Sequence, residues 1–250
     1  MDDAIIISKE TIKRIINDIK VITKTPLTDH GIYYIHDDTD LLKGKALIIG
    51  PKNTPYENGY YLFEFIFPSN YPYSPPKLIY YTNDGNTRFN PNLYKCGKVC
   101  LSILNTWRGE QWTSCQTITT ILLTLCTTLN ETPILNEPGI TKNHEDYFNY
   151  HNILKYKNLE FAVLMILKNE TIMKKFNEFS PIMKQHFIDN YNNNMNTIDK
   201  EIKYLSSSLT LPKHASNYII STNIYHMTIN IDYPELKIKF NDYYENINLK

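Results

Sequence analysis

Four short segments in the first third of the chain carry the sequence pattern of β-strands. They are residues 31–36, 42–49, 60–67 and 77–82. Clusters of Pro, Gly, Asn and Asp separate them, and such clusters mark turns. Their spacing predicts a four-stranded antiparallel meander, in which each strand pairs with the next one along the chain.

In the third of these segments, aromatic residues alternate with other residues. Neighbouring side chains in a strand point to opposite faces of the sheet, so every second residue shares a face. One face collects Tyr61, Phe63, Phe65 and Phe67, and the other collects Leu62, Glu64 and Ile66. We interpret the aromatic stripe as part of the hydrophobic core rather than as a binding surface.

A helix is predicted before the strands, over residues 10–22. Ser8 is a suitable N-cap, and four isoleucines recur every three or four residues, which makes one apolar stripe on a helix. They are Ile12, Ile15, Ile16 and Ile19. The basic residues of this segment fall largely elsewhere on its surface, which is typical of a solvated face.

The segment 117–129 predicts a second helix, and its composition indicates that it is buried. Apolar residues again follow helical spacing, at Ile118, Ile121, Leu122, Leu125 and Leu129. Cys126 lies on the same pattern, so we interpret it as a core thiol.

The rest of the chain carries weaker patterns. Residues 146–167 and 172–191 predict two further helices, and Pro181 is expected to interrupt the second. Three Asn residues at 192–194 and three Ser residues at 206–208 are interpreted as breaks on either side of a short helical segment. Alternation over residues 227–233 and again over 236–240 predicts two short strands around Pro234.

Together these elements predict an α+β fold. An N-terminal helix, the antiparallel meander, a long irregular loop and then helices would form a core over residues 1–150. A helical continuation at 151–191 would pack on or beside that core, and residues 192–250 would be a C-terminal extension. A chain of 250 residues can form one good-sized domain or a domain with an appendage.

The charge balance excludes several classes of function. The formal net charge is zero and the sequence pI is about 7.0, so no overall positive field would draw the chain to nucleic acid or to an anionic membrane. Apolar runs stay well short of a membrane span, and Asp2 and Asp3 stand where a secretion signal would be positive. We therefore expect a cytoplasmic protein, with the nucleus as a second location, and reduced cysteines.

The long irregular stretch at residues 83–112 is the place where we expect function, because long loops in compact domains usually have a functional role. It contains Asn92 eight residues before Cys100, with Gly97 between them. A thiol can carry an acyl group, and a side-chain amide can donate a hydrogen bond to an oxyanion. The pair therefore suits acyl-thioester chemistry.

The run from Asn90 to Ile103 resembles the active-site signature of ubiquitin-conjugating enzymes, in which His-Pro-Asn precedes the catalytic cysteine by the same interval. Further similar motifs follow the family's order. They are Tyr56-Glu57-Asn58-Gly59, Phe67-Pro68-Ser69-Asn70-Tyr71-Pro72, Pro75-Pro76-Lys77 and Gln111-Trp112-Thr113-Ser114. The resemblance covers roughly the first two thirds of the chain, and it implies the family's fold and its transferase activity.

Two departures accompany the resemblance: Asn90 replaces the usual His, and Ser114 replaces the usual Pro. Residues 101–107 and 136–139 resemble a subgroup of larger conjugating enzymes with a C-terminal extension, in which Asn in place of His is familiar. Asn90 is therefore expected to serve turn geometry, and its presence does not indicate an inactive enzyme.

The resemblance implies roles for four residues in catalysis. Cys100 would take ubiquitin, or a related modifier, from an activating enzyme as a thioester and pass it to a substrate lysine. Asn92 would stabilise the oxyanion during lysine attack, or would mainly hold the active-site loop by bonding to backbone. Glu137, with Asn136 as the second candidate, would form an acidic gate that orients the lysine, unless these residues are simply a turn.

The resemblance also implies protein partners and no cofactor, since ATP is used by the activating enzyme upstream. Lys13 and Arg14 on the first helix match residues that bind the activating enzyme. The family's ligase-binding loops correspond to Tyr73 and Pro75 on one side and to Thr113 and Ser114 on the other. The loss of the usual Pro at position 114 weakens the expectation of standard ligase pairing.

Two other functions remain as alternatives. One is a catalytically inactive module of the same fold that binds ubiquitin or a ligase. Retention of both Cys100 and Asn92 favours the enzyme over this module. The other is an unrelated cysteine hydrolase, which would need a His beside Cys100, and the sequence shows no such His nearby.

No metal site is expected from the four cysteines. Their spacing lacks the paired C-x2-C knuckles that are typical of structural zinc. Cys96 lies four residues before Cys100, and a role as a resolving thiol is less favoured than coincidence.

Overall fold

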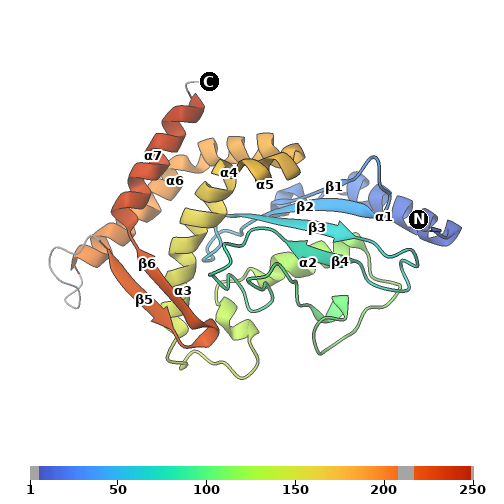
Figure 1. Cartoon of the computed structure of the whole chain (residues 1–250), viewed down its shortest axis with the longest axis horizontal. Helices are drawn as coiled ribbons and strands as arrows, with labels where there is room; N and C mark the ends of the chain where they lie inside the picture. The colour runs from blue at the N-terminus through green and yellow to red at the C-terminus, as the bar shows by residue number, and fades with distance from the viewer. Residues whose placement is uncertain (1–5, 208–216, 249–250) are drawn as a thin grey trace, which may run out of the picture.

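The computed structural model describes residues 6–207 and 217–248. Its first part is helix α1 (Lys9–Lys24) followed by four strands: β1 (Ile32–His36), β2 (Lys43–Ile49), β3 (Tyr60–Ile66) and β4 (Lys77–Tyr80). The strands form one antiparallel sheet in the order β1-β2-β3-β4 (Figure 1), with Phe63 opposite Ala46 on one side and Tyr80 on the other. The predicted meander is confirmed.

Helix α1 begins where the sequence predicts it, because the Ser8 hydroxyl accepts a hydrogen bond from the backbone N–H of Thr11. Helix α2 (Ile118–Thr128) begins in the same way: Thr117 and Thr120 form a reciprocal capping box. Ile15 on α1 and Ile121 and Leu122 on α2 are fully buried. Both predicted helices are therefore confirmed, and the apolar stripe of α2 faces the core. The stripe predicted for α1 is only partly right, because Ile12 and Ile19 are half-buried and Ile16 is 40% exposed.

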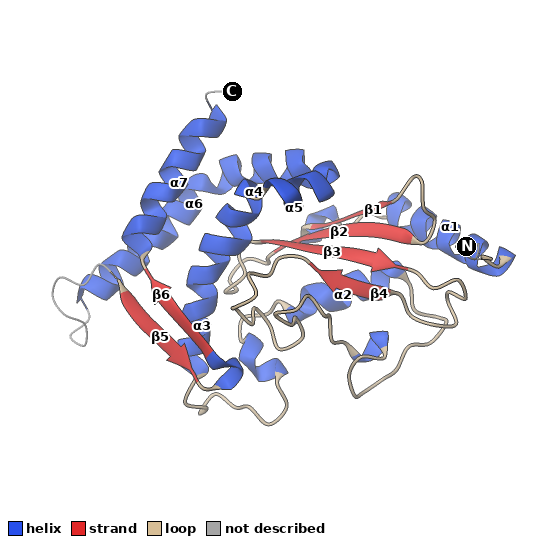
Figure 2. Cartoon of the chain, in the orientation of Figure 1, coloured by secondary structure: helices blue, strands red, loops and turns tan. Residues whose placement is uncertain are grey.

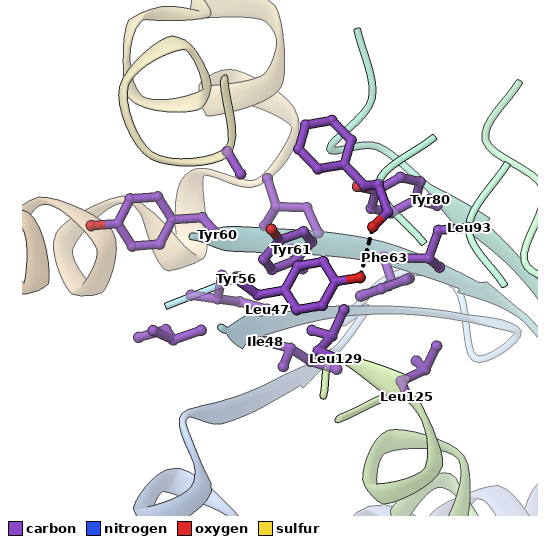
Figure 3. Packing of buried hydrophobic residues seen from close by; sticks show 14 of the residues in the cluster. Leu47, Ile48, Tyr56, Tyr60, Tyr61, Phe63, Tyr80, Leu93, Leu125 and Leu129 are labelled. Atoms are coloured by element: carbon purple, nitrogen blue, oxygen red, sulfur yellow. Dashed lines mark hydrogen bonds between the residues drawn. The ribbon is translucent and has the colours of Figure 1, made fainter. Parts of the chain in front are cut away.

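The centre of the core is rich in tyrosine as well as in aliphatic residues (Figure 3). Buried tyrosines need partners for their hydroxyl groups. Tyr60 donates to the Met183 carbonyl at 2.9 Å, and Tyr61 donates to Asn158 Oδ1 at 2.7 Å. Because Tyr60 and Tyr61 are adjacent, their side chains point to opposite faces of the sheet. The two helical segments that contain Met183 and Asn158 therefore contact β3 from different sides.

The predicted helix at 146–167 is confirmed, although it is not uniform. Helix α3 (Tyr147–Lys157) continues without a break into a π-helical segment, η4 (Asn158–Met165), and then into α4 (Ile166–Lys168). Asn158 begins the π-helical segment and donates to the Glu57 carbonyl at 2.8 Å, in addition to accepting from Tyr61. A π-helical insertion of this kind leaves little trace in apolar spacing.

The second predicted helix, at 172–191, is divided in the structure. Its first part is α5 (Glu170–Lys175), and α6 (Ser180–Ser207) follows after a short 3₁₀ turn. Pro181 lies in the first turn of α6, where its missing N–H has no helical partner to lose. The interpretation of residues 192–194 as a break is wrong, because α6 runs through them and buried Asn194 accepts from Asn58 at 2.9 Å.

The C-terminal part contains a hairpin and a helix (Figure 2): β5 (Tyr218–Thr222), β6 (Met227–Ile231) and α7 (Tyr233–Asn248). The strand predicted over 227–233 is confirmed as β6, and it pairs with β5, which the sequence did not indicate. The strand predicted at 236–240 is wrong. Leu236 and Phe240 are both buried, and they lie one helical turn apart on α7.

This C-terminal part packs against the rest of the chain. Phe240 on α7 lies 5.7 Å from the Phe187 ring on α6, and Asn149 on α3 donates to the Ser221 carbonyl of β5 at 3.0 Å. Figure 1 shows the hairpin and α3 side by side. Across residues 6–207 and 217–248, no helix is long and apolar enough to cross a membrane.

Candidate active site around Cys100

The stretch around Cys100 folds back on itself as an irregular hairpin. Isolated β-bridges join Asn90 to Leu93 and Leu93 to Val99. The turn needs Gly97, whose φ of +85° is a conformation that L residues rarely adopt. The Cys100 N–H donates to the Asn92 carbonyl at 2.8 Å, so the two residues lie beside each other.

The thiol of Cys100 is nearly covered, since the residue is 2% exposed. Its Sγ donates a hydrogen bond to the Thr106 carbonyl at 2.7 Å. The Thr106 hydroxyl is bonded to the backbone of both Val99 and Leu101, which fixes the segment that carries this carbonyl. A cavity of about 610 Å³ lies next to this segment, lined by Thr106, Val99 and Leu78 among others.

Asn92 holds its side-chain amide against the backbone of Cys100. Its Nδ2 donates to the Cys100 carbonyl at 2.8 Å. In this resting arrangement the amide supports the loop, which is one of the two roles predicted for it. Because catalytic hydrogen bonds often form only with substrate present, the oxyanion role stays a prediction.

Asn90 is completely buried and uses its amide for structure, as predicted. Its Nδ2 donates to the Tyr56 hydroxyl and to the Thr128 carbonyl, both at 2.8 Å, and its Oδ1 accepts from the Asn92 N–H at 2.9 Å. Asn90 thereby joins the signature to the core and to the end of α2. A fully bonded buried amide of this kind also fixes the orientation of the following Asn92.

The two gate candidates differ in what holds them. Asn136, at the end of the 3₁₀ helix η3 (Pro133–Asn136), donates to the same Thr128 carbonyl at 3.0 Å and accepts from Asn130 at 2.9 Å. Its amide is therefore a structural tie. Glu137 instead presents its carboxylate to the hydroxyl of Tyr225, which donates to Oε2 at 2.6 Å. A catalytic role for either residue stays a prediction.

Two further residues join the site that sequence reasoning did not single out. Arg88 donates through Nε to the Asn90 carbonyl at 3.1 Å and through Nη2 to the Pro91 carbonyl at 2.7 Å. Its guanidinium carbon lies 3.3 Å from the centre of the Tyr94 ring and 5.0 Å from that of Tyr225. Arg88 could have been noticed from its position just before the signature, but Tyr225 is far away in the sequence.

Comparison with known proteins places this arrangement in a family. Residues 14–159, more than half of the chain, match the family model described as "Ubiquitin-conjugating enzyme". The chain belongs to the ubiquitin-conjugating enzyme family.

Relatives with long chains share this core. Ubiquitin-conjugating enzyme E2 Z of Danio rerio is 37% identical over 187 residues, covering 74% of this chain and 56% of that protein. The Homo sapiens protein of the same name is 37% identical over 181 residues, covering 71% of this chain and 50% of that protein. The chain thus spans about half the length of these relatives. The solved structure of human ubiquitin-conjugating enzyme E2 G1 matches at 30% identity over 50% of this chain and 97% of that chain, with a TM-score of 0.43.

The loops predicted to bind a ligase lie beside α1. Trp112 donates through Nε1 to the Pro72 carbonyl at 2.6 Å, which joins the segment with Thr113 and Ser114 to the segment with Tyr73 and Pro75. Tyr73 is 68% exposed, and Thr113 and Ser114 are exposed as well. Ligase binding by these residues stays a prediction, and the structure shows that they are accessible to a partner.

Lys13 and Arg14 have different surroundings, although both are predicted to bind an activating enzyme. Lys13 is exposed on α1. Arg14 forms an ion pair with buried Asp18 at 2.9 Å and donates to the carbonyls of Ser114 and Gln116, both at 2.5 Å. Arg14 therefore joins the loop that contains Ser114 to the helix.

This difference predicts separable effects of substitution. Arg14→Ala should lower the free energy of unfolding by about 3 kcal/mol, because Asp18 would remain buried without its cation. Lys13→Ala should change the free energy of unfolding by less than about 0.5 kcal/mol. Because Lys13 is predicted to bind the activating enzyme, the same substitution should slow charging, the transfer of ubiquitin from that enzyme to Cys100, several-fold. Urea unfolding and initial charging rates would measure the two effects. Equal stability losses in the two variants, or charging of Lys13→Ala at the wild-type rate, would contradict this assignment.

No metal site is apparent in the part of the chain that the structure describes. Within residues 6–207 and 217–248, no three His, Cys, Asp or Glu side chains are grouped so that they could hold a metal ion. Cys96 and Cys115 are exposed, and Cys126 is half-buried. Burial raises the pKa of the Cys126 thiol, which suits an inert thiol packed against the core.

Proposed function

We propose that this chain is an active ubiquitin-conjugating enzyme that carries ubiquitin, or a ubiquitin-like modifier, as a thioester on Cys100. The observation that supports this most directly is the pairing of Cys100 with Asn92. The N–H of Cys100 donates to the Asn92 carbonyl, and the Asn92 amide donates to the Cys100 carbonyl, each at 2.8 Å. A thiol and an amide donor are thus held together on a braced loop.

The proposed reaction has two acyl transfers. In the first, the Cys100 thiolate attacks the thioester on the activating enzyme; a new C–S bond forms, and the activating enzyme's thiolate leaves. In the second, a neutral lysine amine attacks the Cys100 thioester; a C–N bond forms, the C–S bond breaks, and Cys100 is released as the thiol. ATP is consumed only upstream, and the chain itself needs no cofactor.

The protein's task in this scheme is chiefly positioning, because exchange of one thioester for another is nearly balanced in energy. The hydrogen bond from Cys100 to the Thr106 carbonyl must open so that the thiolate can form and attack. The Asn92 amide is proposed to exchange the Cys100 carbonyl, to which it donates at 2.8 Å, for the oxyanion of the tetrahedral intermediate. Glu137 is proposed to orient the incoming lysine.

The proposed partners follow from the same chemistry: ubiquitin, an activating enzyme, a ubiquitin ligase and protein substrates. Neither nucleic acid nor a membrane is part of the proposal. The proposed location is the cytoplasm, with the nucleus second, because the reaction needs a reduced thiol.

An inactive ubiquitin- or ligase-binding module of the same fold is the second candidate. The observation that favours it is the burial of Cys100, which is only 2% exposed in the resting structure. Retention of the cysteine and of Asn92 favours the enzyme, since neither is needed for binding alone.

A charging experiment decides between the two candidates. The whole chain would be incubated with ubiquitin, ATP and activating enzymes, and run on gels with and without reductant. The proposal expects an ATP-dependent adduct that reductant removes and that free lysine discharges. Absence of an adduct with every activating enzyme and modifier, alongside a conjugating enzyme that charges under the same conditions, would reject it in favour of the binding module.

A further inference from the structure

The C-terminal hairpin reaches the active-site region through one residue, Tyr225. It lies in the 3₁₀ turn η6 (Ile224–His226) between β5 and β6. Its hydroxyl donates to Glu137 at 2.6 Å, its ring faces the Arg88 guanidinium at 5.0 Å, and its carbonyl accepts from Lys95 Nζ at 2.8 Å. A single side chain and its backbone thus contact three charged residues around the active-site loop.

The backbone at this turn is in a costly conformation. Tyr225 has a φ of +61° and the next residue, His226, has a φ of +48°. Large side chains rarely adopt such angles, and they persist where the surroundings enforce them. In this conformation Tyr225 contacts Glu137, Arg88, Lys95 and the ring of Tyr150, all of which lie outside the hairpin.

The contacts of Tyr225 lead to the nucleophile by two routes. Through Arg88 its ring supports the carbonyls of Asn90 and Pro91, which immediately precede Asn92. Through Glu137 it fixes the residue that follows Asn136, whose amide is bonded to the same Thr128 carbonyl as Asn90. Both the signature and the gate are therefore joined to the hairpin.

The hydroxyl of Tyr225 is suited to remain a donor. Burial, followed by the adjacent Glu137 carboxylate, raises the pKa of Tyr225 well above that of an exposed tyrosine. The hydroxyl therefore remains a donor even at a pH where an exposed tyrosine would ionise.

We propose that Tyr225 is a positioning residue of the conjugating site, which makes the C-terminal hairpin part of the machinery for transfer to lysine. This inference rests on the proposed function, since it assigns Tyr225 a role in discharging the Cys100 thioester. Tyr225 orients the Glu137 carboxylate and braces the loop of Asn92; it does not touch the reacting atoms.

The test uses the full chain with the substitutions Tyr225→Phe, Glu137→Ala and both together. Tyr225→Phe removes only the hydroxyl and keeps the ring on Arg88. Lost orientation of a charged partner should slow discharge to free lysine by roughly five- to tenfold, and by much more than it slows charging. The double variant should discharge no more slowly than Glu137→Ala alone, because the hydroxyl acts through that carboxylate.

The matched control is Tyr191→Phe, which removes a hydroxyl bonded to Asn241 between α6 and α7. It should leave discharge unchanged. The inference is overturned if Tyr225→Phe discharges at the wild-type rate, if its loss adds to that of Glu137→Ala, or if Tyr191→Phe shows the same loss. Charging of the wild-type chain is measured separately on the same gel. If the wild-type chain does not charge, the proposed function itself is rejected.

Discussion

Replacing Cys100 with serine should remove the reductant-sensitive adduct completely. The serine hydroxyl can still accept the acyl group, but the bond it forms is an oxygen ester. That ester resists reductant and is cleaved by alkali. Because an alcohol is a weaker nucleophile than a thiolate and an oxygen ester is less reactive toward amines, charging should be slow and discharge to lysine undetectable. Parallel gels with reductant and with alkali would measure this change.

The other cysteines provide matched controls for this experiment. Cys96→Ser changes an exposed thiol on the same irregular hairpin, and Cys126→Ser changes a half-buried thiol on α2. Both variants should keep a reductant-sensitive adduct. If Cys100→Ser kept such an adduct and Cys96→Ser lost it, the carrier would be Cys96, and the role assigned to Cys100 would be wrong.

Replacing Asn92 with alanine should slow discharge to lysine by about a hundred- to a thousandfold, which corresponds to ~2.7–4 kcal/mol of transition-state stabilisation. The lost amide is the donor that lies against the Cys100 carbonyl at 2.8 Å. Stability should fall by only about 1 kcal/mol, which is typical for one intramolecular hydrogen bond. Single-turnover discharge of the preformed adduct and urea unfolding would separate the two effects.

Asn83→Ala is the matched control for Asn92. Asn83 is also half-buried, and its Nδ2 donates to a backbone carbonyl, that of Tyr80, at the same distance of 2.8 Å. This control should lose similar stability while keeping wild-type discharge. Equal discharge rates in Asn83→Ala and Asn92→Ala would show that Asn92 supports the loop and has no part in stabilising the oxyanion.

The elements that the sequence predicted well are those stabilised by a repeating local pattern. The β3 segment alternates aromatic residues, and Phe63 and Phe65 are fully buried on its predicted face. Helix α2 has both apolar spacing and a Thr117 cap, which together define where it begins. In such segments the side chains that pack in the core are the same ones that recur at regular spacing in the sequence. The spacing is therefore sufficient to predict the element and its buried face.

The sequence predictions are wrong where the same residues fit both the spacing of a strand and the spacing of a helix. Leu236, Ile238 and Phe240 alternate as in a strand, yet Leu236 and Phe240 are also four residues apart, as on a helix. Packing against Phe187 of α6 decides in favour of the helix. The Asn run at 192–194 is similarly resolved by tertiary contact, because Asn194 finds a buried partner in Asn58.

The candidate site also has features that the sequence predicts and features that only the structure shows. The order of motifs and the interval between Asn92 and Cys100 are properties of the sequence, and they were sufficient to predict the family. The sequence could not show that Arg14 is bonded to the loop at Ser114, or that Glu137 is held by Tyr225.

The sequence by itself thus determined the sheet, the main helices of the core and the interval between Asn92 and Cys100, the proposed nucleophile. Only the tertiary structure decided that the C-terminal hairpin adjoins the active-site loop and supplies Tyr225 to it. The physical reason is the separation in sequence between the residues that interact. Periodicity and capping act between residues a few positions apart, whereas these hydrogen bonds and ring contacts join residues that only the packed fold brings together.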